Sequence, residues 1–227
     1  MTFIELCRDL VAQFGIAGGA GPDSVSGQTG ELANVVRWIR DAALDIDNRW
    51  EDWRYLWRPY TGTLAPNATS PSPPDQPGAR VRLWQTRTLK YRTANPLAPT
   101  WSDLTYRTYP RFEAMYDPDV AQPGTPRDFT VLPDNTLKFD RPADQAYALK
   151  GSFYLAPALL TGQNDTPLLP AEYHRIIIVR ALKYYADRED APELINAAVS
   201  EYPDLLEKLE SNQLDAFRHR RVASGYG

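Results

Sequence analysis

The spacing of the apolar residues changes twice along the chain, and this change constrains the fold more than any other feature. Near both ends apolar residues recur every three or four positions, which is the spacing of one face of an α-helix. From residue 80 to about residue 153 they alternate with polar residues, as in half-buried strands. The pattern predicts an α+β fold, in which N- and C-terminal helices form one bundle around an inserted antiparallel β-rich lobe.

Two helices are predicted before the lobe. The first covers residues 2–14, where Thr2 as N-cap and Glu5 three residues later match the capping-box pattern. The second begins near Gly30, after a glycine-rich turn, and its apolar positions repeat in steps of three and four from Leu32 to Trp57. A stripe this regular must pack against other helices.

Two further helices are predicted after the lobe. One starts at Pro170 and carries apolar residues on most faces, so we expect it to be the central and most buried helix. The last one opens at Pro192, with Pro203 introducing a kink. No packing pattern continues beyond about Leu214. The predicted division is a helical bundle of residues 1–60 and 165–214, an inserted lobe of residues 61–164 and a flexible tail of residues 215–227.

Proline is unusually frequent in this chain. Twenty of the 227 residues are proline, which is nearly twice the usual share of about 5%. Several of them fall in residues 66–78, which have almost nothing to bury and too many prolines for a helix or an interior strand. We expect this segment to be an exposed loop. Residues 111–116 are expected to form one or two helical turns between the strands.

The composition limits the classes of function. A net charge of −4 and an isoelectric point near 5.3 argue against a protein built to grip nucleic-acid phosphates. The single cysteine, Cys7, excludes an internal disulfide, and with only two histidines a His/Cys metal site is nearly excluded. No secretory signal pattern is present, and the apolar run Ile176–Val179 is far too short to span a bilayer. We therefore predict no cofactor, no metal and no membrane partner.

Motifs for phosphate or dinucleotide binding are incomplete. The glycine turn from Gly21 to Gly27 has the wrong spacing for a Walker A loop, and Gln28 stands where its lysine should be. The dinucleotide pattern that begins at Gly19 is not completed by a third glycine at Ser24. A flexible connection between two helices is the preferred interpretation.

Candidate catalytic residues are few. His174 is expected to be a structural residue at the start of the buried helix, not a general base. Two carboxylate pairs, Asp45 with Asp47 and Glu51 with Asp52, are of the type that glycosidases use, but on a charged helix face such residues are more often solvated. We predict that the chain is not an enzyme. A carboxylate-based hydrolase acting on cell wall is the enzymatic alternative, and it would require a cleft with a perturbed carboxylate.

Aromatic and basic residues interleave in the lobe, and they leave a nucleic-acid alternative open. Stacking rings beside cations bind single strands. Aromatic and arginine residues are also enriched at protein interfaces, and cross-strand packing with an interface role is the interpretation that we prefer. The aromatic candidates are Trp84, Tyr91, Trp101, Tyr106 and Tyr109.

Five segments, in this order, resemble the head-to-tail adaptor, or head-completion, proteins of tailed bacteriophages. Together they lie within residues 3 to 214 and span most of the chain. They are SVSGQTGEL, which opens the second helix, WEDWRYL at its end, GTPRDF in the lobe, and DTPLLPAEYHRIIIVRAL followed by EYPDLLEKLESNQL.

The resemblance implies a structural virion protein that forms a ring, usually of twelve copies, docked beneath the portal at the head-tail interface. It implies a portal ring and a tail or nozzle protein as partners, with genomic DNA passing non-specifically through the middle and assembly in the host cytoplasm. Another virion part, such as a tail-completion protein, is an open alternative. On this pattern the portal-facing residues of the C-terminal tail would be Leu214, Phe217, Arg218, Arg220 and Arg221.

A ring of this kind needs interfaces in which one patch meets a different patch on the next copy. The charge distribution suits such an interface, because the β segment is basic and the region Glu193–Glu210 is acidic. We expect these two regions to face each other between copies, through contacts that weaken with salt. The interface candidates are Arg80, Arg82 and Arg87 on the basic side and Glu201, Glu207 and Glu210 on the acidic side. The tail-side candidates, in the proline-rich segment, are Pro71, Pro73 and Pro74.

Overall fold

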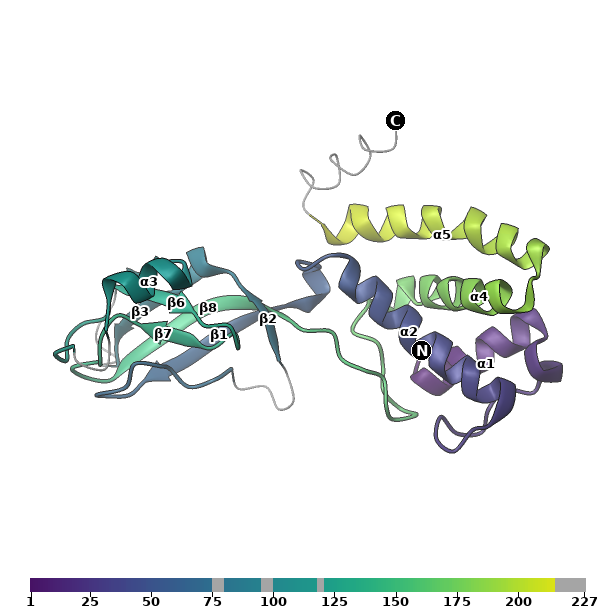
Figure 1. The fold of residues 1–227 in the computed structure, drawn as a ribbon, viewed down its shortest axis with the longest axis horizontal. Helices are drawn as coiled ribbons and strands as arrows, with labels where there is room; N and C mark the ends of the chain where they lie inside the picture. The colour runs from purple at the N-terminus through teal and green to yellow at the C-terminus, as the bar shows by residue number, and fades with distance from the viewer. Residues whose placement is uncertain (75–79, 95–99, 118–120, 215–227) are drawn as a thin grey trace. The chain divides into compact units, whose positions relative to one another are not determined.

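The computed structural model describes residues 1–74, 80–94, 100–117 and 121–214. These form two compact units (Figure 1). The helical unit contains Met1–Tyr55 and the described residues from Pro157 onward, and the sheet unit contains Leu56–Ala156. The sheet unit is thus an insertion between two halves of the helical unit. The predicted α+β class is confirmed, since N- and C-terminal helices pack together and the strands lie between them in sequence.

The helical unit is built around one helix. Its helices are α1 (Phe3–Phe14), α2 (Gly30–Arg49), α4 (Arg175–Glu189) and α5 (Pro192–Gln213), with short 3-10 turns η1 (Ile16–Gly19) and η4 (Ala171–Tyr173). Helix α4 contacts α1, α2 and α5, and Figure 1 shows it between α5 and the other two. Its residues from Ile176 to Val179 are at most 1% exposed. The prediction of a central, buried helix is confirmed.

Helix α1 begins as the sequence predicts. The Glu5 backbone N–H donates to the Thr2 hydroxyl, and the Thr2 backbone N–H donates to the Glu5 carboxylate at 2.7 Å. This reciprocal pair satisfies two of the backbone donors that a helix start leaves without partners. The same hydrogen bonds, from the Thr2 backbone first, lower the pKa of Glu5.

Helix α2 ends earlier than its apolar stripe predicts. It stops at Arg49, whereas the stripe continues to Trp57. Trp53 is fully buried, and its indole N–H donates at 3.0 Å to the carbonyl of Ile46, one of the last-turn carbonyls that have no partner within a helix. Trp57 lies in a strand and is 42% exposed. The last tryptophans therefore keep the spacing of a helix face but lie beyond the end of the helix.

The sheet unit contains two sheets. Its strands are β1 (Trp57–Leu64), β2 (Val81–Trp84), β3 (Lys90–Thr93), β4 (Ser102–Asp103), β5 (Thr105–Tyr106), β6 (Asp128–Val131), β7 (Leu137–Phe139) and β8 (Tyr147–Leu155). The helical turns are η2 (Arg54–Leu56) at the boundary, η3 (Thr86–Thr88) and α3 (Tyr109–Met115). Helix α3 confirms the prediction for residues 111–116. Strand β1 was not predicted, and the expected lobe boundary after residue 60 falls inside it.

Strand β8 organises the larger sheet. It pairs antiparallel with β1 along its length on one side and with β2 and β3 on the other, while β4 pairs with β3. The first residue of β1, Trp57, lies opposite Tyr154, near the end of β8, so the unit begins and ends on neighbouring strands. In the smaller sheet β6 is antiparallel to β7 but parallel to β5, which departs from the antiparallel prediction.

An aromatic core fills one face of the larger sheet. Trp84 packs between Tyr60, at 4.9 Å between ring centroids, and Phe153, at 5.4 Å. Phe153 is fully buried, and Tyr60 is 1% exposed. Burial, as the larger effect, raises the pKa of the Tyr60 hydroxyl to about 12, although the hydroxyl donates to the carbonyl of Ser72.

The proline-rich segment is only partly the exposed loop that the sequence predicts. The Ser72 backbone N–H donates to the Thr63 carbonyl at 3.0 Å, and the Ser72 hydroxyl accepts from the Thr63 N–H at 3.1 Å. The Thr69 carbonyl accepts from the N–H of Phe139 at 2.8 Å. The segment therefore covers one end of strand β1, which lies at the edge of its sheet and also carries Pro59. Such devices block strand pairing between molecules.

Candidate interaction surfaces

The face of the larger sheet that lies opposite its core is open to solvent along strand β1. Along β1 the residues alternate, with Tyr60 and Leu64 buried in the core and Thr61 and Thr63 exposed on the opposite face. The core-facing side also holds Phe153 of β8. An open sheet face in a protein of this size is a candidate binding surface.

Three large side chains form a row across this open face. Trp57 on β1 and Leu83 on β2 both lie opposite Tyr154 on β8, so the three share one register and one face. Trp57 is 42% exposed and Leu83 is 39% exposed. We call Trp57, Tyr154 and Leu83 the apolar row.

A glutamine holds the apolar row in place. The Trp57 indole N–H donates to Gln85 Oε1 at 3.1 Å, and Gln85 Nε2 donates to the Tyr154 hydroxyl at 3.0 Å. Ser152, which is buried, donates through its hydroxyl to the same Gln85 oxygen at 2.5 Å. These hydrogen bonds hold the indole in one orientation while its ring stays exposed. Less side-chain entropy is therefore lost when a partner binds.

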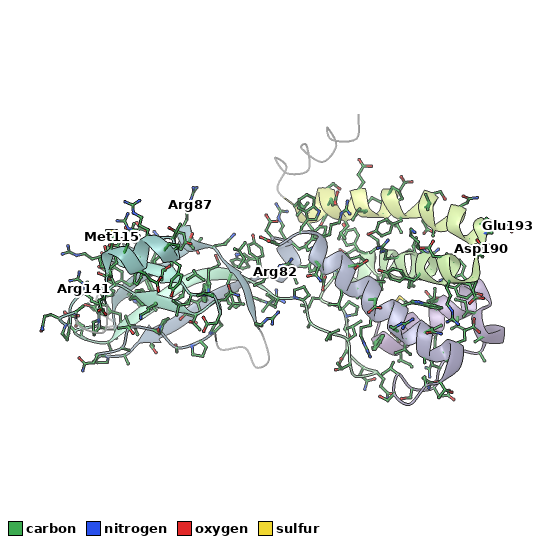
Figure 2. The ribbon with its side chains drawn as sticks, viewed as in Figure 1. Arg82, Arg87, Met115, Arg141, Asp190 and Glu193 are labelled. Atoms are coloured by element: carbon green, nitrogen blue, oxygen red, sulfur yellow. The ribbon has the colours of Figure 1, made fainter. Side chains whose placement is uncertain are left out.

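The predicted basic residues lie near Leu83 and Gln85 along the chain, with Arg80 just before β2. Arg80 and Arg87 are exposed and Arg82 is half-buried. Arg82 belongs to β2 and Arg87 to η3, and both are labelled in Figure 2. All three arginines thus lie within four positions of Leu83 in the chain.

The aromatic candidates for nucleic-acid stacking do not share one environment. Trp84 is 7% exposed in the core and donates its indole N–H to the Asn135 carbonyl at 2.8 Å, so it cannot stack on a base. The ring of Trp101 already carries two cations, Arg92 at 4.8 Å and Lys150 at 4.4 Å from its centroid.

The three remaining aromatic candidates also have partners within the unit. Tyr91 packs edge-on against Tyr147. Tyr106 is 40% exposed and packs on Phe129, and the Tyr109 hydroxyl donates to a nearby carboxylate, that of Glu113. These contacts are those of aromatic residues that pack a small sheet unit.

The predicted acidic interface residues divide into two kinds. Glu201 forms a two-bond pair with Arg175, at 2.8 and 3.0 Å, and this hydrogen bonding lowers the pKa of Glu201. Glu210 is 3% exposed, and its Oε1 accepts from Arg49 Nε and from the Trp50 indole N–H, both at 2.9 Å. Glu210 therefore holds α5 against the end of α2 and is not available to a neighbouring copy.

Exposed acids remain on the outer face of α5. Glu207, the third predicted residue, is exposed, as are Glu193 and Asp204. Figure 2 labels Glu193 at the start of α5. Between these acids lies Val199, whose side chain is 51% exposed. The outer face of α5 is thus acidic with an apolar centre.

Two of the carboxylates considered for catalysis, Asp45 and Asp47, make structural contacts. Asp45 accepts from Arg180 Nη2 at 2.6 Å and from the Tyr184 hydroxyl. Burial would raise its pKa, but the hydrogen bonds from Tyr184 and Arg180 together outweigh burial and lower it, opposite to the shift of a general acid. Asp47 is 7% exposed and accepts from the Tyr55 hydroxyl at 2.8 Å.

His174 has the structural role that the sequence predicts. It is 1% exposed, its Nε2 lies 3.0 Å from the Leu169 carbonyl, and its Nδ1 lies 3.0 Å from the Met1 amino nitrogen. Burial is the main reason that its pKa is lowered. An imidazole in this position is neutral at pH 7, and it links the segment before α4 to the helix itself.

One cavity of the helical unit, of about 290 Å³, lies between α2 and the segment that leads to η4. Its lining is mainly apolar, and Asp47 is among its few polar residues. In the part of the chain that the structure describes, no cluster of three or more His, Cys, Asp or Glu residues is arranged to hold a metal ion. No helix within those residues is long and apolar enough to cross a membrane.

The C-terminal candidates are only partly described. Leu214 is 2% exposed and its backbone N–H donates to the Glu210 carbonyl at 2.9 Å, so its side chain belongs to the packing of α5. The buried side chain of Leu214 therefore anchors the C-terminal end of α5. Phe217, Arg218, Arg220 and Arg221 lie outside the described residues.

Comparison with known families decides what kind of protein carries these surfaces. The sequence profile of a family described as SU10 adaptor protein matches residues 1–224. The chain belongs to the SU10 adaptor protein family. This is a family of phage head-to-tail adaptors, which are structural proteins of the virion and not enzymes. The resemblance seen in the sequence is confirmed. No curated protein matches the chain.

Because this SU10 adaptor protein belongs to the family, its partners are expected among the other proteins of the virion.

Sequence reasoning missed the apolar row on the open sheet face, because the last tryptophans were assigned to a helix. A signal was present, since from Trp57 to Leu64 the residues WRPYTGTL contain Pro59, which disfavours a helix interior. The exposed positions then alternate with Tyr60 and Leu64, as in a strand with one buried face.

Proposed function

We propose that this adaptor forms a dodecameric ring that docks beneath the portal, joins the capsid to the tail and surrounds the path of the DNA. The observation that carries the proposal is the family match over residues 1–224, which includes both units and the segment after α5. The chain supplies what a ring subunit needs, namely a helical unit with a buried core, an inserted unit with an open face, and basic and acidic residues on different units.

The portal contact is assigned to the segment after α5. Helix α5 is fastened at its end, because the Glu210 carboxylate binds Arg49 and Trp50 while Leu214 is buried. The sequence that follows contains two aromatic residues, Phe217 and Tyr226, and three arginines, which suits folding on binding in an acidic or polar groove of the portal. The proposed portal residues there are Phe217, Arg218, Arg220 and Arg221, with Leu214 as their anchor.

Contacts between copies are assigned to the basic and acidic surfaces. A ring requires two different patches on each subunit, and the arginines of the sheet unit and the outer acids of α5 provide them. Exposed charges interact through solvent and are screened, so this part of the assembly should weaken with salt. The residues proposed to act here are Arg80, Arg82, Arg87 and Glu207; Glu201 would act only by exchanging its partner Arg175.

The proline-rich segment is proposed to face the tail or a neighbouring copy. Pro73 is exposed, while Pro71 and Pro74 are half-buried. Because Ser72 between them caps strand β1, a deletion of the whole segment would disturb the sheet as well as any contact. Substitution of Pro73 alone is the cleaner way to examine the tail contact.

The charge of the chain suits a channel through which DNA slides. With a net charge of −4 the subunit does not offer the excess of cations that would hold phosphates. The DNA contact is therefore proposed to be close but non-specific.

The proposal is tested by mixing the purified chain with the portal ring from the same genome and determining the mass by light scattering. We expect a stoichiometric complex, and we expect truncation after Leu214 to abolish it. A control with Met115→Ala, an exposed position in α3 of the sheet unit, should still bind the portal. If no complex forms at any salt concentration, the portal assignment is wrong and another tail-completion role takes its place.

A further inference from the structure

The apolar row has the properties of an interface centre, because it combines two exposed apolar side chains with an aromatic ring held in one orientation. Tryptophan and tyrosine contribute more than most residues to the energy of protein interfaces when they are desolvated. Here Trp57 and Leu83 flank Tyr154 and are 42% and 39% exposed. Gln85 fixes both the indole and the phenol by hydrogen bonds, so little side-chain freedom remains to be lost on binding.

The surroundings of the row select the charge of its partner. Arg80 and Arg87 are exposed on the segment that contains Leu83. A partner that covers the row must therefore offer an apolar centre with acidic residues around it. Basic residues on the partner would be repelled by these two arginines.

Helix α5 of the same chain offers a surface of this kind. Val199 is 51% exposed, and the exposed Pro203 follows it by one turn on the same side of the helix. Glu193, Asp204 and Glu207 are exposed along the helix. The opposite side of α5 packs on α4 through buried residues such as Ala198 and Leu209, which leaves Val199 and Pro203 exposed.

We propose that the apolar row of one copy binds the outer face of α5 of a second copy around Val199. The flanking arginines of the first copy then face the acids of α5 in the second. The two patches are different, so the contact is head-to-tail and propagates from copy to copy until a ring closes. This inference rests on the proposed ring and identifies the side chains at the centre of its subunit contact.

The test uses disulfide capture, for which this chain is well suited. Its single cysteine, Cys7, is fully buried, and burial raises the pKa of the thiol to about 12, so it reacts little at neutral pH. Two variants, Leu83→Cys and Val199→Cys, are mixed at equal, high concentration with diamide as the oxidant. A disulfide forms only where two Cα atoms approach to within about 7 Å.

The expected product is a covalent dimer that joins one Leu83→Cys chain to one Val199→Cys chain. Its rate of formation should exceed, by at least tenfold, that of Met115→Cys with Val199→Cys. Met115 is a matched control because it is 49% exposed in α3 of the same sheet unit. Equal rates for the two pairs, or a predominance of Leu83→Cys dimers with themselves, would overturn the proposal.

A second variant shows whether the row supplies the affinity. Adding Trp57→Ala to Leu83→Cys should slow capture about 30-fold, since an interface tryptophan contributes about 2 kcal/mol. Adding Thr61→Ala, on the same face of β1 but outside the row, should change the rate less than twofold. If both additions have the same effect, the row is not the centre of the contact.

The capture experiment and the portal experiment can fail separately. Preferential capture without any portal complex would leave the copy-to-copy contact in place and remove the portal assignment. A stoichiometric portal complex without preferential capture, in solution or on the portal, would leave the adaptor role and remove the apolar row as the subunit contact.

Discussion

The two units of this adaptor are stabilised in different ways. In the helical unit, particular polar pairs fasten the helices, such as Asp45 with Arg180 and Glu210 with Arg49. In the sheet unit, one strand, β8, joins three others through its backbone, and aromatic rings fill one face. In the helical unit, polar pairs thus fasten helices that pack around the buried helix α4, whereas the larger sheet depends on one strand and its aromatic core.

The largest expected effect is in the sheet core. Phe153→Ala removes a fully buried ring from β8 and should lower the free energy of unfolding of the sheet unit by about 3–5 kcal/mol. Amide hydrogen exchange, followed separately in the two units by mass spectrometry, measures this. Faster exchange throughout β1, β2 and β3 with unchanged protection of α4 would show that the two units unfold separately.

The control for this prediction is Thr61→Ala, an exposed position on the other face of the same sheet. We expect it to change stability by less than about 0.5 kcal/mol. If Phe153→Ala instead lowers the protection of α4 as much as that of β1, the units unfold together and the comparison fails.

An intermediate effect is expected at a helix end. Glu210→Ala leaves Arg49 and the Trp50 indole without their shared acceptor and should cost about 2 kcal/mol of stability. Glu207→Ala, one turn earlier but exposed, should cost less than about 0.5 kcal/mol. Urea denaturation followed by tryptophan fluorescence distinguishes them. Equal losses in the two variants would show that the Glu210 pair does not hold α5.

The smallest effect appears only on acidification. The pKa of His174 is lowered in the folded chain, mainly by burial, so protonation favours the unfolded state, whose histidine pKa is about 6.5. Stability should therefore be complete above about pH 6.5 and should fall as the pH is lowered from there toward the folded pKa. The nearest groups are the Met1 amino nitrogen, which lowers this pKa, and Glu172, which raises it.

The measurement is the change in thermal midpoint between pH 7.5 and pH 5.5 in the native chain and in two variants. His174→Gln should show a smaller change than the native chain. His219→Gln, which replaces the only other histidine, is the matched control and should behave like the native chain. A native-like pH profile in His174→Gln would mean that this histidine does not carry the acid sensitivity.

The helices and the α+β class were predictable because each is a local pattern. The capping box at Thr2, the buried run in α4 and the start of the last helix at Pro192 are encoded by neighbouring residues, and the structure confirms them. Propensity and periodicity act within a few turns, so a single sequence is sufficient to find such elements.

The contacts that join distant residues could not be predicted. Nothing near Glu210 in the sequence shows that Arg49 and Trp50, about 160 positions earlier, will bury it. The stripe of α2 also misled beyond Arg49, because a four-residue step between tryptophans does not require a helix. The indole of Trp53 instead turns back to the Ile46 carbonyl, seven positions earlier, a side-chain contact that periodicity does not express.

The place where the sheet unit joins the helical unit has a consequence for the evolution of such adaptors. Because Trp57 pairs with Tyr154, the inserted chain begins and ends on adjacent strands, only about 5 Å apart. A stretch of gene encoding the insertion can therefore be exchanged by recombination without changing the distance that the flanking halves must bridge. Phage genomes could in this way acquire a new sheet unit, and with it a new attachment surface, while keeping the same helical unit.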